Sequence, residues 1–170
     1  LAAALLPGVP AHAQTADPRD YRLIVKVPRE EVDQWLKQEI AKSKGKFDAE
    51  RYHFVVGFST GHYGSDPVQA IAMRRLAFSL LNHTFAAGDR VTPVSWELEL
   101  WDRGKSIDLT DDPQTRAAFV DAVPYAPAEN SRGGHDTERA IYETLTDVVP
   151  KNGAASTIVL LLTNTNQSQG

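Results

Sequence analysis

The pattern of apolar and polar positions changes along the chain from an N-terminal helix to an alternation of strands and helices. One amphipathic helix is predicted between Pro28 and Gly45 by four apolar residues at helical spacing: Val32, Trp35, Leu36 and Ile40. The β-branched run "YRLIVKVP" before it predicts a short strand that ends at Pro28.

From Tyr52 onward, apolar segments alternate with helical patterns. The near-continuous apolar runs "YHFVVGF" and "TIVLLLT" predict two buried strands of a parallel sheet. Helices are predicted over residues 67–83, from Asp112 to about Val123, and from Asp136 to Pro150, the last with an apolar face of Ile141, Leu145, Val148 and Val149. This order favours an α/β fold with a doubly wound, mostly parallel sheet and helices on both faces.

One segment of the chain alternates strictly. Between residues 94 and 100, apolar Val94, Trp96, Leu98 and Leu100 are separated by Ser95, Glu97 and Glu99. Strict alternation predicts a half-buried strand, and the turn sequence "DRGK" followed by "SIDLT" predicts an antiparallel hairpin at the edge of the sheet.

The N-terminal residues and the composition indicate an exported protein. The start "LAAALLPGVPAHAQ" is apolar and contains Ala11-His12-Ala13, so residues 1–13 are interpreted as the remainder of a signal peptide, with a disordered leader as the alternative. Residues 14–50 then form an N-terminal extension, and residues 51–170 the main domain. We expect a periplasmic or extracellular location.

Composition excludes several classes of function. The net charge of -4 argues against a nucleic-acid partner, and the absence of cysteine excludes disulfides and thiolate chemistry. No apolar run reaches the roughly 18 residues that a membrane span requires, so membrane association would need segments outside this sequence.

A serine between two glycines suggests one chemical function. "GFSTG", residues 57–61, matches the G-x-S-x-G turn that presents the nucleophile of α/β-hydrolases, and Ser59, Asp111 and His135 follow the order of a catalytic triad. In that turn, however, a helix begins directly after the serine, whereas here residues 62–66 precede the helix signal at Pro67. A serine hydrolase is therefore kept as the alternative function.

The order of motifs over residues 52–164 resembles a von Willebrand factor type A (vWA) domain. The resemblance is carried by "GFSTG", "GDRVTPVSWE", "SIDLTDD", "RGGHDTERAIYETL" and "TIVLLLTN", and covers about two thirds of such a domain, whose last strands and helices would lie beyond Gly170. It implies a three-layer α/β fold and a non-enzymatic role in binding another protein.

In that family a metal-ion-dependent adhesion site lies at the strand ends. The resemblance places its D-x-S-x-S positions on Gly57, Ser59 and Gly61, its threonine on Thr137 and its last aspartate on Asn164. Ser59, Thr137 and Asn164 would be the metal ligands, but both carboxylates are missing. Because Mg²⁺ is usually held by at least one carboxylate, a degenerate site that binds Mg²⁺ or another divalent cation weakly or not at all is expected, unless Asp66 or Asp136 substitutes.

The leading hypothesis is therefore an exported binding module that contacts a protein partner through the loops at the carboxyl ends of the strands. Its expected binding residues are Ser59, Thr60, His62, Asp136 and Thr137. Simpler roles remain open: Ser59 and Thr137 as turn or helix caps, and Asn164 as an ordinary loop residue. Residues 21–44 could also be the functional part, carried by the domain.

Overall fold

The computed structural model describes residues 28–42, 51–61, 63, 68–124, 126–131, 133–149 and 157–162. The expected signal peptide and first strand lie outside these residues. The described elements are α1 (Arg29–Lys42), β1 (His53–Ser59), α2 (Val68–His83), β2 (Arg90–Trp96), β3 (Leu100–Arg103), β4 (Ile107–Asp108), α3 (Pro113–Asp121), α4 (Thr137–Glu143), its π-helical continuation η2 (Thr144–Val148) and β5 (Thr157–Leu162).

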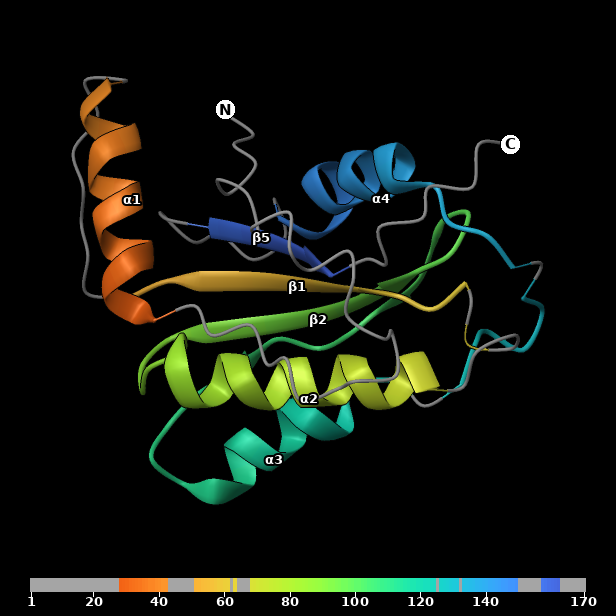
Figure 1. Cartoon of the computed structure of the whole chain (residues 1–170), viewed down its shortest axis with the longest axis horizontal. Coiled ribbons are helices and arrows are strands. Elements are labelled where there is room, and N and C mark those ends of the chain that lie inside the picture. Colours follow the sequence, from red (N-terminus) through yellow and green to blue (C-terminus); the bar gives the residue numbers. More distant parts are fainter. Residues whose placement is uncertain are drawn as a thin grey trace, which may run out of the picture.

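The strands form one five-stranded, mostly parallel sheet in the order β3-β2-β1-β5, with β4 also paired to β2 (Figure 1). Strand β1 runs parallel to β2 on one side and to β5 on the other. His53 pairs with both Arg90 and Thr157, so the three parallel strands begin at the same end of the sheet. The mixed α/β class predicted from the sequence is confirmed.

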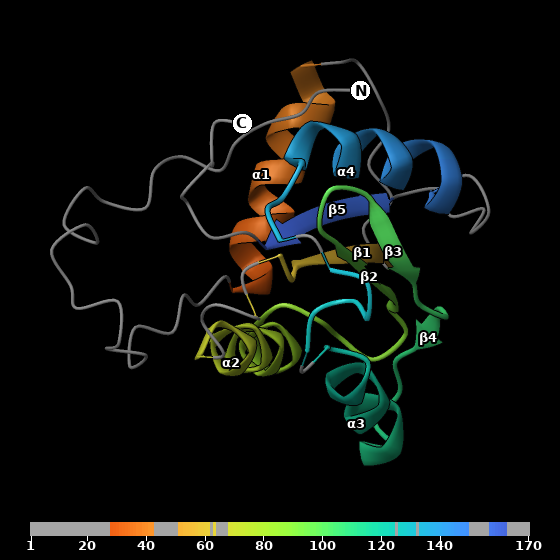
Figure 2. The same cartoon turned by 90° about the vertical axis from the view of Figure 1, so that its right-hand side faces the viewer.

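Both faces of β1 are covered by apolar side chains. Phe54, Val56 and Phe58 belong to a core cluster with residues of α2 and α3, whereas Val55 belongs to a second cluster with Trp96 and residues of α4 and η2. Figure 2 shows α2 and α3 on one side of the sheet and α4 on the other. The uninterrupted apolar run of β1 follows from this burial on two sides.

The hairpin turn lies earlier than the sequence predicted. Strand β2 ends at Trp96, and the Glu97 amide donates to the carbonyl of Glu99 at 3.0 Å, which starts the reversal into antiparallel β3. Glu97 is only 6% exposed, whereas Leu98 is 44% exposed. At these two positions the acidic residue is buried and the apolar residue faces solvent, which is the reverse of the predicted alternation. The prediction of one strand through residue 100, turning at "DRGK", was wrong because Glu97 finds hydrogen-bond donors in the interior.

The inward face of the last helix also differs from the prediction. Ile141 is 40% exposed, whereas Ala140, Thr144 and Val148 are buried. Ala140 and Val148 pack with Trp96, so small side chains let the helix approach the sheet. The predicted starts of the two later helices are confirmed, since Asp112 and Asp136 cap α3 and α4 by accepting from backbone amides at 2.9 Å.

The predicted N-terminal helix is confirmed as α1, and it is joined to the domain at the end where the strands begin. The Arg29 guanidinium lies 4.1 Å above the Tyr52 ring and bonds the buried Asp89 carboxylate at 2.6 Å. Leu36 packs against the main core. Within the described ranges, no helix is long and apolar enough to cross a membrane.

We predict that stability falls as the pH is lowered below about 6.5, because of His53. Its Nε2 lies 2.7 Å from Thr92 Oγ1, and burial, followed by the charge of Arg90, lowers its pKa below the ordinary 6.5. The unfolded chain therefore binds a proton that the folded chain excludes, which favours unfolding as the pH falls, by at most about 1.4 kcal/mol per pH unit. Urea unfolding at neutral and mildly acidic pH measures this slope. His53→Gln is expected to reduce it, whereas the slope should persist in His83→Gln, which changes an exposed histidine.

Candidate functional site

The candidate site is the set of loops at the carboxyl ends of β1 and β2, which lie side by side because Ser59 pairs with Trp96. We call these the strand-end loops and define them as residues 59–61, 97–101, 126–131 and 133–136. They come from three separate parts of the chain (Figure 1). Parallel strands place the residues that follow them at one edge of a sheet, which is where ligands of open α/β folds usually bind.

The buried carboxylate of Glu97 joins these loops. One oxygen accepts a hydrogen bond from the Ala128 amide at 3.1 Å, and the other accepts from the Ser131 hydroxyl at 2.6 Å. The Glu97 backbone carbonyl accepts from the Asp136 amide at 2.8 Å. A buried carboxylate is costly unless it is hydrogen-bonded, so these bonds fix loop 126–136 to the end of β2.

Thr60 connects the end of β1 to the same carboxylate. Its hydroxyl oxygen lies 3.3 Å from Oε1 of Glu97 and 3.3 Å from the carbonyl oxygen of Trp96, and it can donate its single proton to only one of them at a time. The same oxygen accepts from the Trp101 indole N–H at 2.9 Å. The register between β2 and β3 shifts at this point, consistent with a β-bulge at Trp101, and bulges commonly redirect a side chain.

Two glycines bring the loops into direct backbone contact. A Cβ atom on Gly61 would lie 1.5 Å from the carbonyl oxygen of Gly134, so no side chain fits at residue 61 as the loops are folded. Gly134 has φ of +78°, a conformation that side chains rarely adopt. The "GFSTG" and "GGHDT" segments therefore pack backbone to backbone.

The space beside Gly57, where the resemblance to vWA domains would place an aspartate, is also filled. Gly57 lies within β1, and a Cβ there would be 2.6 Å from Cδ2 of Leu161 and 2.9 Å from the Trp96 ring. A side chain at residue 57 would therefore require Leu161 and the Trp96 ring to move, and one at residue 61 would require the backbone of Gly134 to move. Among the described residues, no three histidine or acidic side chains gather as possible metal ligands.

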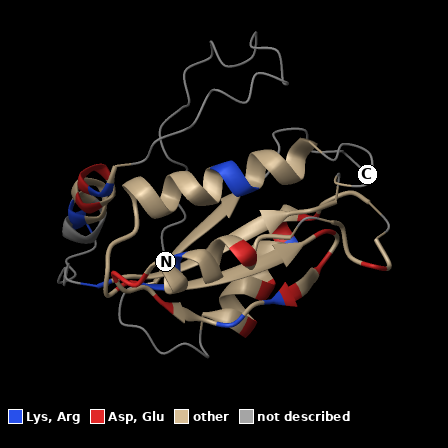
Figure 3. Ribbon diagram, turned by 90° about the horizontal axis from the view of Figure 1, so that it is seen from below, with Lys and Arg blue, Asp and Glu red and all other residues tan. Residues whose placement is uncertain are grey.

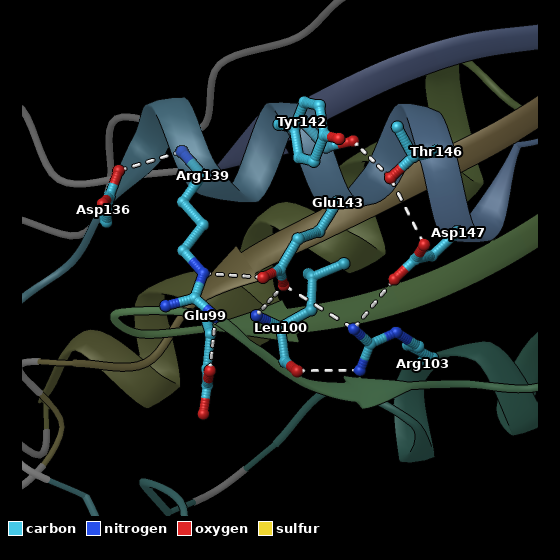
Figure 4. A network of polar contacts seen from close by, with 9 residues as sticks. All are labelled: Glu99, Leu100, Arg103, Asp136, Arg139, Tyr142, Glu143, Thr146 and Asp147. Atoms are coloured by element: carbon cyan, nitrogen blue, oxygen red, sulfur yellow. Dashed lines mark hydrogen bonds and ion pairs between the residues drawn. The ribbon is translucent and has the colours of Figure 1, made fainter.

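A network of charged residues fixes the β2–β3 hairpin to α4 (Figure 4). Arg139 bonds Glu99 and Glu143, each at 2.7 Å, and Glu143 accepts from the Leu100 amide at 2.8 Å. Burial alone would raise the pKa of Glu143, but the hydrogen bonds from Leu100 and Arg139 lower it overall. Arg103 adds a bond to Asp147 at 3.2 Å. These contacts fix the hairpin to α4 through Arg139 and Glu143 and to η2 through Asp147.

The structure places the expected binding residues as follows. Ser59 is the last residue of β1 and only 3% exposed, and Thr60 is buried beside Glu97. Asp136 is the N-cap of α4 and Thr137 is its first residue, so the capping role belongs to Asp136. His62, Asp66 and Asn164 lie outside the described residues.

The residues of the possible catalytic triad are not brought together. Asp111 follows β4, which pairs with β2 at Arg90, whereas Ser59 pairs with Trp96 at the other end of β2. Six residues of extended strand separate the two ends by about 20 Å. In addition, α2 begins only at Val68 and not directly after Ser59, as a nucleophile turn requires.

Sequence reasoning missed Glu97 and Trp101. Glu97 was interpreted as a solvent-facing position of an alternating strand, and Trp101 was given no role. The only signal was the long polar loop 126–136, whose backbone groups need hydrogen-bond partners, and nothing in the sequence identified Glu97 as that partner.

The strand-end loops expose both apolar and acidic side chains. Leu98 is 44% and Trp101 37% exposed. Glu99, Glu129 and Asp136 are also exposed, and Figure 3 shows acidic residues along the ribbon at the end where β1 and β2 terminate. Comparisons of this chain with protein-family models, with curated proteins and with solved structures found no match.

Proposed function

We propose that this chain is an exported, non-enzymatic binding module with a vWA-like, doubly wound fold, and that it contacts a protein partner through the strand-end loops. The sheet order β3-β2-β1-β5, with antiparallel β3 at the edge beyond β2, supports the vWA-like arrangement. Export rests on the apolar N-terminal segment that ends in Ala11-His12-Ala13.

The observation that carries the proposal is the hydrogen bonding of Glu97. Its carboxylate and carbonyl hold loop 126–136 against the ends of both β1 and β2. Loops that are fixed before binding lose little conformational entropy when a partner arrives. The arrangement therefore suits recognition of a surface, and Asp111 of the possible triad lies toward the other end of the sheet from Ser59.

We further propose that the loops hold together without a metal ion. In the family the ion links the same loops through aspartate, serine and threonine oxygens. Here the loops are linked instead by the contact between Gly61 and Gly134 and by the hydrogen bonds of Glu97. The remaining hydroxyls of Ser59 and Thr137 are neutral ligands, which bind Mg²⁺ weakly without a carboxylate.

Site-specific photocross-linking tests the binding role. Benzoylphenylalanine at position 98 is expected to give a discrete cross-linked protein in the envelope fraction of the producing cells, and the same group at exposed position 78 on α2 should not. Glu97→Ala, which releases loop 126–136, should weaken the cross-link at position 98. Equal products from both positions, or none from position 98, would contradict the proposed surface.

A fluorophosphonate probe tests the alternative enzyme class. We predict no labelling of Ser59, because it is buried at the end of β1 and Asp111 lies at the opposite end of the sheet. Gel fluorescence after incubation with the probe measures this. Stoichiometric labelling that disappears in Ser59→Ala would establish a serine hydrolase instead.

A further inference from the structure

Two apolar side chains of the β2–β3 hairpin are both exposed and held in place. The indole N–H of Trp101 is satisfied by Thr60 Oγ1 at 2.9 Å, which leaves part of the ring facing solvent. Leu98 Cδ2 lies 3.5 Å from the position that a Cβ on Gly134 would take. This side chain therefore lies beside the backbone contact between Gly61 and Gly134. Tryptophan is among the residues that most often supply binding energy in protein interfaces.

The charges around these two side chains are mainly negative. Exposed Glu99 and Glu129 lie in the loops that Glu97 joins, and Asp136 is held to the Glu97 carbonyl through its backbone amide. Arg139 pairs with Glu99 and Glu143, which compensates part of the charge of Glu99 as well as its own. Over residues 97–101 and 126–139 the chain has five acidic residues and two arginines: Glu97, Glu99, Glu129, Asp136, Glu138, Arg132 and Arg139. Of these, Arg132 lies outside the described residues.

We infer that the strand-end loops bind a positively charged protein segment that presents an apolar or aromatic side chain. The apolar side chain packs on Leu98 and Trp101, and lysine or arginine side chains flanking it lie near Glu99, Glu129 and Asp136. This inference rests on the proposed function and names the partner class of the same surface. Exposed ion pairs contribute about 0 to 1 kcal/mol each, so the charges select the partner and speed its approach, while the apolar contact supplies affinity.

Fluorescence anisotropy with defined peptides tests the inference on the full chain. Three short fluorescein-labelled peptides share a central phenylalanine and differ only in flanking residues: lysine and arginine, serine and glycine, or aspartate and glutamate. The basic peptide is expected to bind about 10-fold more tightly than the neutral one, from two or three weak ion pairs. This preference should shrink at high salt, because exposed charges are screened.

Variants separate the apolar contribution from the charge. Leu98→Ser is expected to weaken all binding, and Glu99→Gln combined with Glu129→Gln to remove only the preference for the basic peptide. Phe78→Ala on α2 and Glu31→Gln on α1 are matched controls that should change neither. Circular dichroism verifies that each variant is folded.

The outcomes distinguish this inference from the proposed function. Binding that depends on Leu98 but shows no preference for the basic peptide, or favours the acidic one, would overturn the inference and leave the binding surface intact. Peptide binding that is unaffected by Leu98→Ser, or no binding of any peptide, would also overturn it. The photocross-linking experiment then decides separately whether the surface binds a protein.

Discussion

Replacing Asp89 by alanine is expected to lower the free energy of unfolding by about 3 to 5 kcal/mol, the usual cost of removing one partner of a buried charge pair. Asp89 is 1% exposed, and its carboxylate accepts hydrogen bonds from Arg29 at 2.6 Å and from the backbone amides of Tyr52 at 3.0 Å and Ala86 at 2.9 Å. Without it, the two amides lose their acceptor, and the Arg29 guanidinium keeps only Asp33 and the Thr84 carbonyl among its described acceptors. Urea unfolding measures the loss, and faster amide exchange in α1 would show that the helix has separated from the domain.

Asp108 provides a matched control for Asp89. It forms an Arg–Asp pair with Arg90 at 2.7 Å near the same end of the sheet, but the two side chains are 69% and 43% exposed. Asp108→Ala should therefore cost less than about 1 kcal/mol. Equal losses in the two variants would contradict the view that burial of Asp89 fixes α1 to the domain.

Placing an aspartate at residue 57, as the resemblance to vWA domains suggests for a metal ligand, is expected to unfold the domain rather than to build a metal site. The new Cβ would meet Leu161 and Trp96 at less than 3 Å, and its carboxylate would be buried without a partner. Overpacking costs about 1 to 3 kcal/mol, and the unpaired charge adds several more. Chemical unfolding with and without Mg²⁺ measures the effect. Stabilisation of Gly57→Asp by Mg²⁺ would contradict the prediction.

Three further variants test the steric conflicts at these glycines. Gly57→Ala adds the steric conflict without the charge, and should retain the fold at reduced stability. Gly61→Ala forces the backbones of residues 61 and 134 apart, whereas at Gly133 a Cβ would meet only the Gly61 carbonyl, at 3.5 Å. Gly133→Ala should therefore cost only about 1 to 2 kcal/mol, for its left-handed backbone.

The elements that depend on local pattern were predictable from the sequence. The buried run of β1, the Pro28 start of α1 and the Asp112 cap of α3 each have a local cause in residue type and spacing. The errors arose where contacts distant in sequence decide the outcome. Alternation alone predicts that Glu97 faces solvent, and only its hydrogen bonds to residues 128 and 131 explain why it faces inward.

The candidate site was predictable in its location and not in its organisation. Parallel strands imply that Ser59 and the segment after β2 lie at one edge, and they do. The sequence shows glycine at residues 57 and 61, but it cannot reveal that Trp96, Leu161 and the Gly134 carbonyl fill the space beside them. Close approaches of this kind depend on tertiary packing, which leaves no local pattern.

Calorimetric titration with Mg²⁺ and Mn²⁺ tests most directly whether the strand-end loops are held by the protein's own contacts and not by an ion. With Gly57 and Gly61 closed to side chains and Glu97 already hydrogen-bonded, the expected result is no detectable binding or a dissociation constant of about 1 mM or weaker, worth roughly 4 kcal/mol or less. Sub-micromolar affinity that is lost in Ser59→Ala would show that a working metal site organises these loops.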